Sequence, residues 1–465
     1  MRFSLTDTIA AIATPPGISA LAMLRVSGSN AISLVSSIFS EPDKITKAAG
    51  YQAVHGCIVD SDIIDEVICL IYRNPHSYTG EDMVEISCHG NPDLTNRILQ
   101  LLLKSCRVAE PGEFTFRAFM NHKLDLAQAE AVSDLIHAQT AKAESAALQQ
   151  LKGNLSSEIV SIIASLTESR IQFELAIDFA DQDLPQIDLT GVEEKLDKIL
   201  HRLKELFQKG TQGRILRDGF TVCLTGAPNV GKSSVFNKFL DENRAIVTAQ
   251  PGTTRDYLEE WLSLSGFPIR LIDTAGLRET ENEAEQIGIS KTKELQAKAD
   301  LNILLTDPDT FNPDLLLESR SQNNTLLILN KIDLLGFDEL PAIKEWTDYL
   351  SSEFDFTGKA ELAVYPCSTV IPNGINLIKE QILARISLPE SELSSVLVTN
   401  TRHLAAIERS ITSLPHAISA IQADLGYEFI AFDLIEAVSA LSEITGAVTT
   451  DDMLDRIFSS FCIGK

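Results

Sequence analysis

The sequence predicts a multidomain fold of the α/β plus α class, and three observations support this prediction. The chain has 465 residues, which exceeds one ordinary domain and suggests about two to four. Near its middle, residues 226–233 form a glycine-rich phosphate-binding motif between a strand-like run and a helix-like run. Long runs rich in good helix formers lie before and after the region that contains this motif.

These observations divide the chain into four segments. We expect an N-terminal α/β domain at residues 1–120 and an all-helical domain in two parts, at 121–218 and 388–465. A Ras-like P-loop domain with a mostly parallel sheet is expected at 219–387, inserted between the two helical parts. Such an insertion is feasible because the termini of a domain often lie close together.

The N-terminal segment has the periodicity of a mixed α/β domain. Strands are expected at residues 20–26, 65–72 and 82–88, and a helix at 30–38. Arg25 and Glu85 each interrupt one of these apolar strands. By strand alternation alone, both are outward-facing positions. Residues 111–117 are expected to form a compact loop with aromatic side chains.

The helical segments are predicted from apolar residues at three- and four-residue spacing. Before the P-loop domain, helices are expected at residues 124–151, 156–179 and 192–209, followed by a hinge at 210–213. After it, helices are expected at residues 404–425, 429–444 and 452–461, the first of them kinked or split at Pro415. A basic cluster is either a solvated face or an RNA contact; it consists of Arg202, Lys204, Lys209, Arg214 and Arg217.

The glycine-rich motif runs from Gly226 to Ser233, where a strand turns into a helix and backbone N–H groups can surround phosphates. Lys232 would reach the β- and γ-phosphates of a nucleotide, and the Ser233 hydroxyl would bind Mg²⁺. The residues expected to contact the nucleotide here are Asn229, Val230, Gly231, Lys232, Ser233 and Ser234.

Two later motifs extend the phosphate and metal site. Residues 251–256 contain Thr253 and Thr254, and offer a threonine to Mg²⁺ and the γ-phosphate. A second motif ends a predicted strand, so its aspartate can hold the Mg²⁺ shell and its glycine N–H can contact the γ-phosphate. The residues of this motif are Asp273, Thr274, Ala275 and Gly276.

A fourth motif selects the base. Asn330, Lys331 and Asp333 follow an apolar strand, and the Asp333 carboxylate can accept two N–H bonds from the edge of guanine. Adenine cannot supply that pattern, and a mismatched base would leave buried polar groups unpaired, so GTP is favoured over ATP. Residues 367–369 are expected as the guanine-side loop, with Ser368 as the contact.

Hydrolysis needs a group that orients the attacking water and a cation for the charge of the transition state. Leu277 occupies the position where many GTPases have a glutamine, so one of the carboxylates at 279–285 is a candidate, although most of them also fit a solvated acidic loop. The cation can be an arginine finger or a monovalent ion. Asn229 can ligate such an ion with carbonyls of residues 248–253, or it only stabilises the loop.

Composition limits the partners and the compartment. The formal net charge of −26 opposes non-specific binding to nucleic acid, so contact with RNA requires local basic patches or a partner protein. Seven cysteines without a C-x-x-C pair are typical of a reducing compartment. No apolar run approaches the ~18 residues of a membrane span and no signal-peptide core follows Met1, so we expect a cytoplasmic protein without a membrane contact.

Together the motifs resemble those of the MnmE (TrmE) family of tRNA-modification GTPases, and the resemblance runs essentially from end to end. The N-terminal matches are residues 13–17, 24–28, 78–82, 89–90, 111–114 and 123–130. The later matches are the Asn-x-Gly-Lys-Ser phosphate loop at 229–233, residues 273–278 and residues 461–465. One departure is Thr369-Val370, which replaces the usual small and basic residues of the guanine loop.

The resemblance implies that the N-terminal domain is folate-binding-like. It would bind the one-carbon donor 5-formyl-tetrahydrofolate and form a homodimer. The folate contacts that the motifs imply are Arg25, Glu85, Lys123 and Lys465. This implication replaces the interpretation of Arg25 and Glu85 as ordinary outward-facing positions.

The resemblance also implies a GTPase that is activated by K⁺ and uses Mg²⁺. The implied K⁺ contacts are Asn229, Thr248, Gln250 and Thr253. Mg²⁺ would be held by Ser233 and Thr254, and the water-positioning catalytic residue would be Glu285.

The implied reaction is the modification of C5 of the wobble uridine in certain tRNAs with an aminomethyl or carboxymethylaminomethyl group. The implied partners are tRNA and the flavoprotein MnmG, in a heterotetramer. A different class of function remains as an alternative, a GTP-dependent assembly or ribosome-binding switch without folate chemistry, because the GTP motifs alone permit either.

Overall fold

The computed structural model describes residues 5–179, 187–243, 258–273, 294–311, 324–342, 345–346, 348–350, 364–386 and 396–464. The chain divides into two compact units. Unit 1 consists of residues 1–133, 150–200 and 409–465, and unit 2 of residues 134–149 and 201–408. None of the helices in the described ranges combines the length and the apolar character that crossing a membrane requires.

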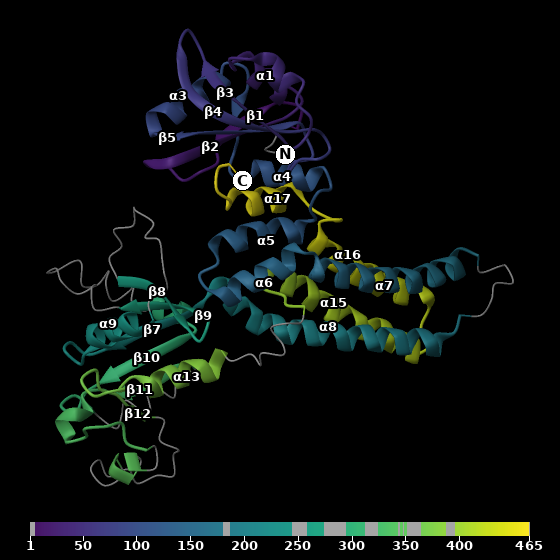
Figure 1. The fold of residues 1–465 in the computed structure, drawn as a ribbon. Coiled ribbons are helices and arrows are strands. Elements are labelled where there is room, and N and C mark those ends of the chain that lie inside the picture. Colours follow the sequence, from purple (N-terminus) through teal and green to yellow (C-terminus); the bar gives the residue numbers. More distant parts are fainter. Residues whose placement is uncertain are drawn as a thin grey trace, which may run out of the picture. The chain divides into compact units, whose positions relative to one another are not determined.

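Unit 1 contains a six-stranded sheet in the order β3-β4-β5-β2-β1-β6 (Figure 1). All neighbouring strands are antiparallel except β1 and β6, which are parallel. The strands are β1 Ile9–Ile12, β2 Ser19–Ser27, β3 Gln52–Val59, β4 Ile63–Tyr72, β5 Met83–Gly90 and β6 Arg107–Val108. The predicted strands at 20–26, 65–72 and 82–88 correspond to β2, β4 and β5.

One face of this sheet forms the core of the N-terminal part. Alternate side chains such as Leu24 and Ile86 pack under three helices. These helices are α1 Ala31–Ser37, α2 Pro42–Thr46 and α3 Pro92–Leu102. The register places Arg25 of β2 directly opposite Glu85 of β5, on the other face of the sheet.

The aromatic segment at 111–117 was predicted as a loop, and that prediction is wrong because most of it begins a helix. Helix α4 covers Glu113–Met120 and starts after Gly112, whose φ of 73° is a left-handed value that favours glycine. A Cβ on Gly112 would lie 2.5 Å from the carbonyl oxygen of Phe458. Helix α17, Asp451–Ser459, therefore approaches α4 closely, and the two lie side by side (Figure 1).

The helix predicted at 124–151 is two helices, α5 Leu126–His137 and α6 Ala141–Leu151. The segment contains no Gly or Pro, and polar side chains interrupt the predicted helix instead. The Gln139 side chain donates to the His137 carbonyl at 3.2 Å, and the Thr140 hydroxyl accepts from the Ala143 N–H at 3.3 Å. Such local bonds compete with helical ones and favour a new helix start.

The hinge predicted at 210–213 is also wrong, because α8 continues from Leu189 to Asp218 through both glycines. A Cβ on Gly210 would lie 2.4 Å from Leu404 Cδ2, and one on Gly213 would lie 2.5 Å from the Val398 carbonyl oxygen. The glycines therefore allow the segment at 398–404 to approach the helix. The remaining helices lie close to the ranges predicted for them; they are α7 Asn154–Asp178, α15 Thr401–Gln422 and α16 Tyr427–Thr445. The split predicted at Pro415 is wrong, because α15 is one helix that contains this residue. The proline removes one backbone donor, but buried residues on both sides of it, Leu414 and Ala417, keep the helix packed.

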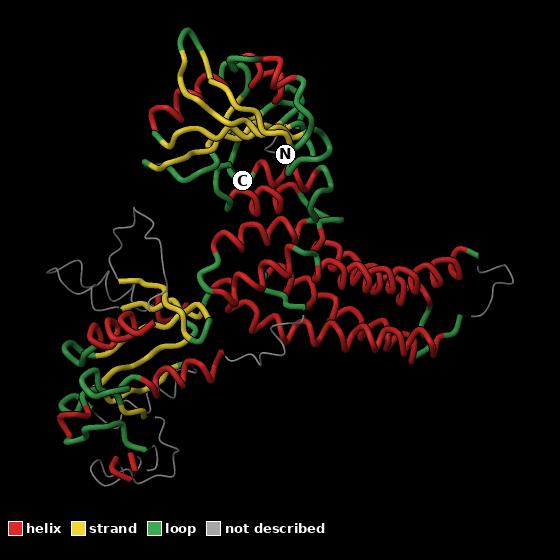
Figure 2. Tube along the Cα trace, in the orientation of Figure 1, coloured by secondary structure: helices red, strands yellow, loops and turns green. Residues whose placement is uncertain are grey.

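In the described part of unit 2, six strands form a second sheet in the order β12-β11-β10-β7-β9-β8 (Figure 1). Within it β8 is antiparallel to β9, and the other neighbouring strands are parallel. Figure 2 draws these strands in yellow. The strands are β7 Phe220–Gly226, β8 Leu258–Leu264, β9 Phe267–Asp273, β10 Leu301–Thr306, β11 Thr325–Leu329 and β12 Val364–Pro366. Helices α9 Lys232–Asn243 and α13 Asn376–Ile386 contribute to the same core. The predicted class, α/β plus α with a mostly parallel P-loop sheet, is confirmed.

Candidate functional site

The phosphate-binding motif connects β7 to α9, as the sequence predicts. Gly226 has a φ of 136° and Gly231 a φ of 95°. A Cβ on Gly226 would lie 2.1 Å from the Leu305 carbonyl oxygen, and one on Gly231 would lie 2.3 Å from Asn330 Nδ2. Both positions therefore require glycine, because backbone angle and space each exclude a side chain.

Two oxygen groups meet at the start of α9. Ser233 Oγ donates to Asp273 Oδ2 at 2.8 Å, and Asp273 is fully buried at the end of β9. A hydroxyl and a carboxylate are hard oxygen donors of the kind that Mg²⁺ prefers, so this pair fits that ion. Lys232 Nζ lies beside the same loop and donates to the carbonyls of Gly226 at 3.1 Å and Ala227 at 2.8 Å.

The guanine motif is attached directly to the phosphate loop. Asn330 Nδ2 donates to the Val230 carbonyl at 2.8 Å, and Lys331 Nζ donates to the Asn229 carbonyl at 2.7 Å. Lys331 also forms a 2.8 Å ion pair with Asp307. Burial raises the pKa of Asp307, but its bonds to Lys331 and Thr310 outweigh burial and leave that pKa below its ordinary value.

Sequence reasoning missed Asp307. Its signal is positional, because the residue directly follows β10 at the carboxyl end of a parallel strand, where ligands bind in α/β sheets. Its carboxylate accepts from Lys331 Nζ, which also donates to the Asn229 carbonyl of the phosphate loop. Asp307 therefore helps to fix the contact between the base motif and the phosphate loop.

Ser368 is hydrogen-bonded to Asp333. Its hydroxyl is fully buried, donates to Asp333 Oδ1 at 2.5 Å and accepts from the Val370 N–H at 3.1 Å. This arrangement fixes the carboxylate that would read guanine. The departure at Thr369-Val370 leaves these bonds intact, because Val370 contributes only its backbone and its side chain is 77% exposed.

The remaining predicted residues of the nucleotide site divide into two groups. Asn229 and Ser234 are exposed at the loop and at the first turn of α9, and Asn229 adopts a left-handed φ of 64°. The others lie outside the described residues; they are Thr248, Gln250, Thr253, Thr254, Thr274, Ala275, Gly276 and Glu285.

A second candidate site lies in unit 1 around Arg25. Its Nη2 and Nε donate to Glu85 Oε1 at 2.7 and 3.0 Å, and both side chains are nearly covered, with 13% and 10% exposed. Tyr72, which sequence reasoning missed, donates to Glu85 Oε2 at 2.9 Å. Burial, followed by this bond, raises the pKa of Tyr72 to about 12, so its hydroxyl keeps its proton.

The C-terminal segment reaches the same site. Arg25 Nη1 donates to the Gly464 carbonyl at 3.0 Å. The guanidinium also lies 5.6 Å from the ring centre of Tyr78 and 5.5 Å from that of Phe114, within cation–π range. Lys465 lies outside the described residues, but the residue before it contacts Arg25. Both rings belong to stretches that match the family motifs, residues 78–82 and 111–114.

Lys123 lies against the loop that carries Tyr78. Its Nζ donates to the Pro75 carbonyl at 3.1 Å, and its stem would lie 3.3 Å from a Cβ on Gly80. The structure therefore brings Arg25 and Glu85 into direct contact and places Lys123 against the loop whose Tyr78 ring lies beside Arg25.

The basic cluster on α8 is largely neutralised. Arg202 pairs with Glu205 at 3.0 Å, Arg214 with Asp300 at 3.2 Å and Arg217 with Asp134 at 2.8 Å. These pairs favour the interpretation of the cluster as a solvated face over that of an RNA contact.

Comparison with known proteins gives a family for this chain. A model described as the GTP-binding protein TrmE N-terminus matches residues 8–123, and one described as the MnmE helical domain matches residues 126–462. The chain belongs to the MnmE (TrmE) family. A tRNA modification GTPase MnmE from Moorella thermoacetica is 42% identical over 99% of this chain and 100% of its own length. The MnmE proteins of Christiangramia forsetii and Clostridioides difficile are 39% and 38% identical over the same shares.

These matches confirm the family resemblance predicted from the motifs. They also confirm the enzyme class at the level of the family, whose members are named tRNA modification GTPases. At the carboxyl ends of the strands of unit 2, the structure brings the phosphate loop together with Asp273 and with Asn330 of the base motif.

Proposed function

We propose that this protein is a potassium-activated GTPase that acts with the flavoprotein MnmG to modify C5 of the wobble uridine in certain tRNAs. The modification adds an aminomethyl or carboxymethylaminomethyl group and uses a one-carbon unit from tetrahydrofolate. One observation carries the proposal. The chain combines GTP motifs that are hydrogen-bonded to one another with a covered Arg25–Glu85 pair, in which Arg25 also bonds to Gly464 near the C-terminus.

In the GTP site, each residue has a role that follows from its chemistry. Lys232 and the backbone N–H groups of the phosphate loop would bind the phosphates, and Asp333 would read the base. Ser233 and Thr254 would hold Mg²⁺, and Glu285 would orient the attacking water. The potassium contacts would be Asn229, Thr248, Gln250 and Thr253. The bound cations would supply the positive charge that the transition state needs.

The exposed side chain of Asn229 supports its role as an ion contact. Lys331 already binds the Asn229 carbonyl at 2.7 Å, which fixes the backbone at this position. The amide oxygen of the side chain, on an exposed residue of the phosphate loop, remains suited to a monovalent cation beside the phosphates.

In the N-terminal domain, Arg25, Glu85, Lys123 and Lys465 would contact 5-formyl-tetrahydrofolate. The burial of the Arg25–Glu85 pair supports this assignment, because a covered ion pair costs desolvation free energy that an ordinary surface position would not require. A guanidinium and a carboxylate together present the donors and acceptors that a polar heterocycle such as a pterin can use.

The proposed assembly is a homodimer that joins MnmG in a heterotetramer in the cytoplasm and acts on tRNA. Apolar side chains on the N-terminal part support the homodimer, since Ile18 is 93%, Leu21 67% and Ile68 50% exposed. Leu21 and Ile68 lie on the sheet face that carries Arg25. With a net charge of −26, contact with tRNA would rely on a local surface or on the flavoprotein.

Hydrolysis of GTP in potassium and in sodium at equal ionic strength, with Mg²⁺ present, tests the GTPase part of the proposal. A large rise that is specific to potassium is expected. Equal rates would contradict the potassium site and would reduce Asn229 to a residue that stabilises the loop. Calorimetric titration with 5-formyl-tetrahydrofolate tests the folate part.

The second candidate is a GTP-dependent assembly or ribosome-binding switch without folate chemistry. It is favoured by the observation that Arg25 finds acceptors within the chain for Nε, Nη1 and Nη2, as a purely structural arginine would. Absence of folate binding, together with an Arg25→Ala variant that changes stability alone, would support this candidate.

A further inference from the structure

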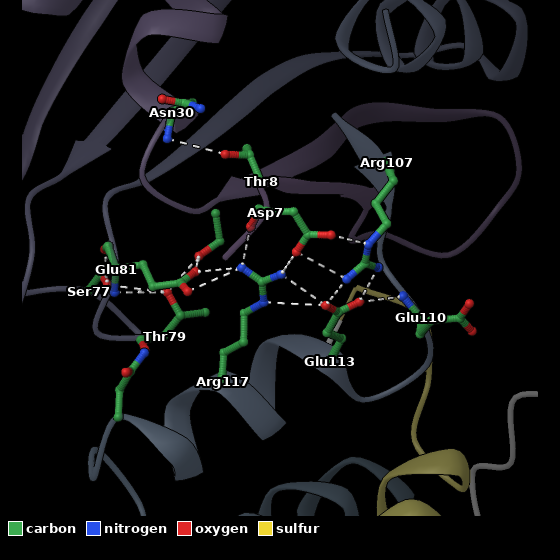
Figure 3. A network of polar contacts seen from close by, with 12 residues as sticks. Asp7, Thr8, Asn30, Ser77, Thr79, Glu81, Arg107, Glu110, Glu113 and Arg117 are labelled. Carbon is green, nitrogen blue, oxygen red and sulfur yellow. Dashed lines mark hydrogen bonds and ion pairs between the residues drawn. The ribbon is translucent and has the colours of Figure 1, made fainter. Parts of the chain in front are cut away.

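A second group of charged side chains lies in unit 1, and the sites described above do not use it (Figure 3). Its centre is Arg117 on α4, whose side chain is fully buried, as is that of Glu113 one turn earlier. Removing a guanidinium from water costs several kcal/mol unless carboxylates compensate for the lost hydration. The other charged members are Asp7, Glu81 and Arg107.

Arg117 connects three segments that are far apart in the sequence. Its Nη1 donates to the Asp7 carbonyl at 2.8 Å and to both Glu81 oxygens at 3.1 Å. Its Nη2 donates to Asp7 Oδ1 at 2.8 Å and to Glu113 Oε1 at 3.0 Å. The guanidinium therefore joins the residues before β1, the loop between β4 and β5, and α4 itself (Figure 3).

Two of these segments carry the rings that flank Arg25. Tyr78 precedes Glu81 in the loop between β4 and β5, and Phe114 directly follows Glu113 on α4. The Tyr78 hydroxyl lies 2.9 Å from Thr115 Oγ1, so the loop and the helix are also bonded beside the rings. The relative position of the two rings thus depends on the same contacts that Arg117 makes.

The loop is also attached to the strand that carries Arg25. Ser27 Oγ donates to Glu81 Oε2 at 2.7 Å, and it lies 2.7 Å from Thr79 Oγ1. Ser27 follows Arg25 by two residues, so the two side chains share one face of β2. A displacement of Glu81 would move the loop with respect to Arg25.

We propose that Arg117 is a positioning residue of the folate site. It acts through Glu81 and Glu113, and it holds the rings of Tyr78 and Phe114 beside the Arg25 guanidinium without touching the ligand. This inference rests on the folate part of the proposed function. Replacement of the planar guanidinium by an ammonium group would remove the paired bonds and release the loop.

Arg107 provides a matched control. It pairs with Asp7 at 2.6 Å and with Glu113 at 2.6 Å, so it shares two carboxylates with Arg117. Within the described ranges its ion pairs are with those two groups and not with Glu81. A substitution of Arg107 therefore disturbs the same network but leaves the attachment of the loop in place.

The test compares Arg117→Lys with Arg107→Lys in the full chain. Calorimetric titration with 5-formyl-tetrahydrofolate measures Kd, and thermal unfolding measures stability in parallel. Arg117→Lys is expected to weaken binding by about tenfold or more, because small displacements of contact groups have large effects. Arg107→Lys is expected to bind normally although it also lowers the unfolding temperature. GTP hydrolysis should be unchanged in both variants.

Equal losses of affinity in the two variants, or normal binding by Arg117→Lys, would overturn the inference. If Arg117→Lys does not fold, Glu81→Gln replaces it, since this variant keeps the shape of the side chain and removes the charge that Arg117 holds. Normal folate binding by Glu81→Gln would then refute the inference. A wild-type chain that does not bind 5-formyl-tetrahydrofolate would refute the folate part of the proposed function, and this inference with it.

Discussion

At the scale of the residue, Asp333 should decide which base is bound. A carboxylate can accept two N–H bonds from guanine, whereas the amide of Asp333→Asn has one acceptor and one donor group. We expect this variant to lose its preference for GTP over xanthosine triphosphate, as measured by competition for binding. Ser368 should remain bonded in the variant, because an amide oxygen can still accept its hydroxyl.

A matched variant keeps this test specific. Val370→Lys restores a basic residue beside the base loop without changing the backbone N–H that bonds to Ser368. It should retain the wild-type preference for guanine. An unchanged preference in Asp333→Asn would remove Asp333 from the base site.

Glu285 lies outside the described residues, and the family motif makes a separate prediction for it. Glu285→Ala should bind GTP with normal affinity but lose most of its hydrolysis, because the attacking water is no longer oriented. Single-turnover hydrolysis and nucleotide binding measure the two properties separately. Glu281→Ala in the same acidic run is the control and should hydrolyse GTP normally. Turnover near the wild-type rate in Glu285→Ala would contradict the assignment.

Asp7 makes stability depend on pH at the acid end. Burial raises its pKa, but Arg107 and Arg117 outweigh burial and hold the pKa below its ordinary value of 3.8. The stability it contributes is therefore complete above that value and is lost as pH falls through the lower pKa of the folded state. Urea unfolding from about pH 7 to about pH 2.5 should show this loss, and Asp7→Asn should flatten it. Parallel pH curves for the two proteins would contradict the prediction.

The residues and the family resemblance together pointed to both candidate sites. Arg25 and Glu85 are charged residues within apolar strands, but strand alternation alone makes them ordinary outward-facing positions, and their place at a folate site is what the resemblance implies. The GTP motifs stand out because glycine and polar residues follow apolar strands in a known spacing. Tyr72 and Asp307 could not be found in this way, since their importance comes from partners that are distant in the sequence. Tyr72 contacts Glu85 across neighbouring strands, and Asp307 contacts a lysine 24 residues later.

At the scale of the element, sequence periodicity located most helices and strands of the described ranges but misjudged their ends. The break between α5 and α6 depends on two side-chain bonds that do not alter the apolar pattern. Short strands such as β6 have too few residues for any periodicity, and pairing with β1 defines them. The helix break is therefore local but leaves the apolar pattern unchanged, whereas β6 depends on tertiary pairing that no local rule can supply.

The glycines of α8 give a prediction at this scale. Gly213→Ala should lower the free energy of unfolding by about 1–3 kcal/mol, because the new Cβ overpacks the interface with the segment around Val398. The expected clash is at 2.5 Å with a backbone oxygen, which cannot move independently of its chain. Urea unfolding of the full chain measures the change.

Gly191→Ala, in the first turn of the same helix, is the control. The atoms nearest to its Cβ belong to the Asp188 side chain, which can shift but accepts from the Gly191 N–H at 3.1 Å. Because alanine is the better helix former, its gain offsets the weakened bond to Asp188, and this variant should keep nearly the stability of the wild type. Equal effects of the two substitutions would show that intrinsic helix propensity, and not close approach, governs both positions.

At the scale of the whole molecule, the two candidate sites are each built from residues of one unit. Arg25, Glu85 and Gly464 belong to unit 1, and the phosphate loop with the guanine motif belongs to unit 2. The chain order alone predicted an inserted P-loop domain, but it did not predict that helical residues 134–149 and 201–218 would group with that domain. This grouping depends on packing, which includes the close approach of α8 at its glycines.

Because the two candidate sites share no residues, we expect substitutions in one site to leave the function of the other unchanged. Arg25→Ala should abolish binding of 5-formyl-tetrahydrofolate and leave GTP hydrolysis in potassium within about twofold of the wild type, because sites without shared partners behave independently. Asn229→Ala should lose the rise in hydrolysis that potassium gives and keep folate binding. Calorimetry and hydrolysis in potassium and sodium, applied to both variants and the double variant, complete the comparison. If Arg25→Ala also lost the potassium response, the two units would have to be coupled through contacts beyond the two sites, and the independence of the sites would be refuted.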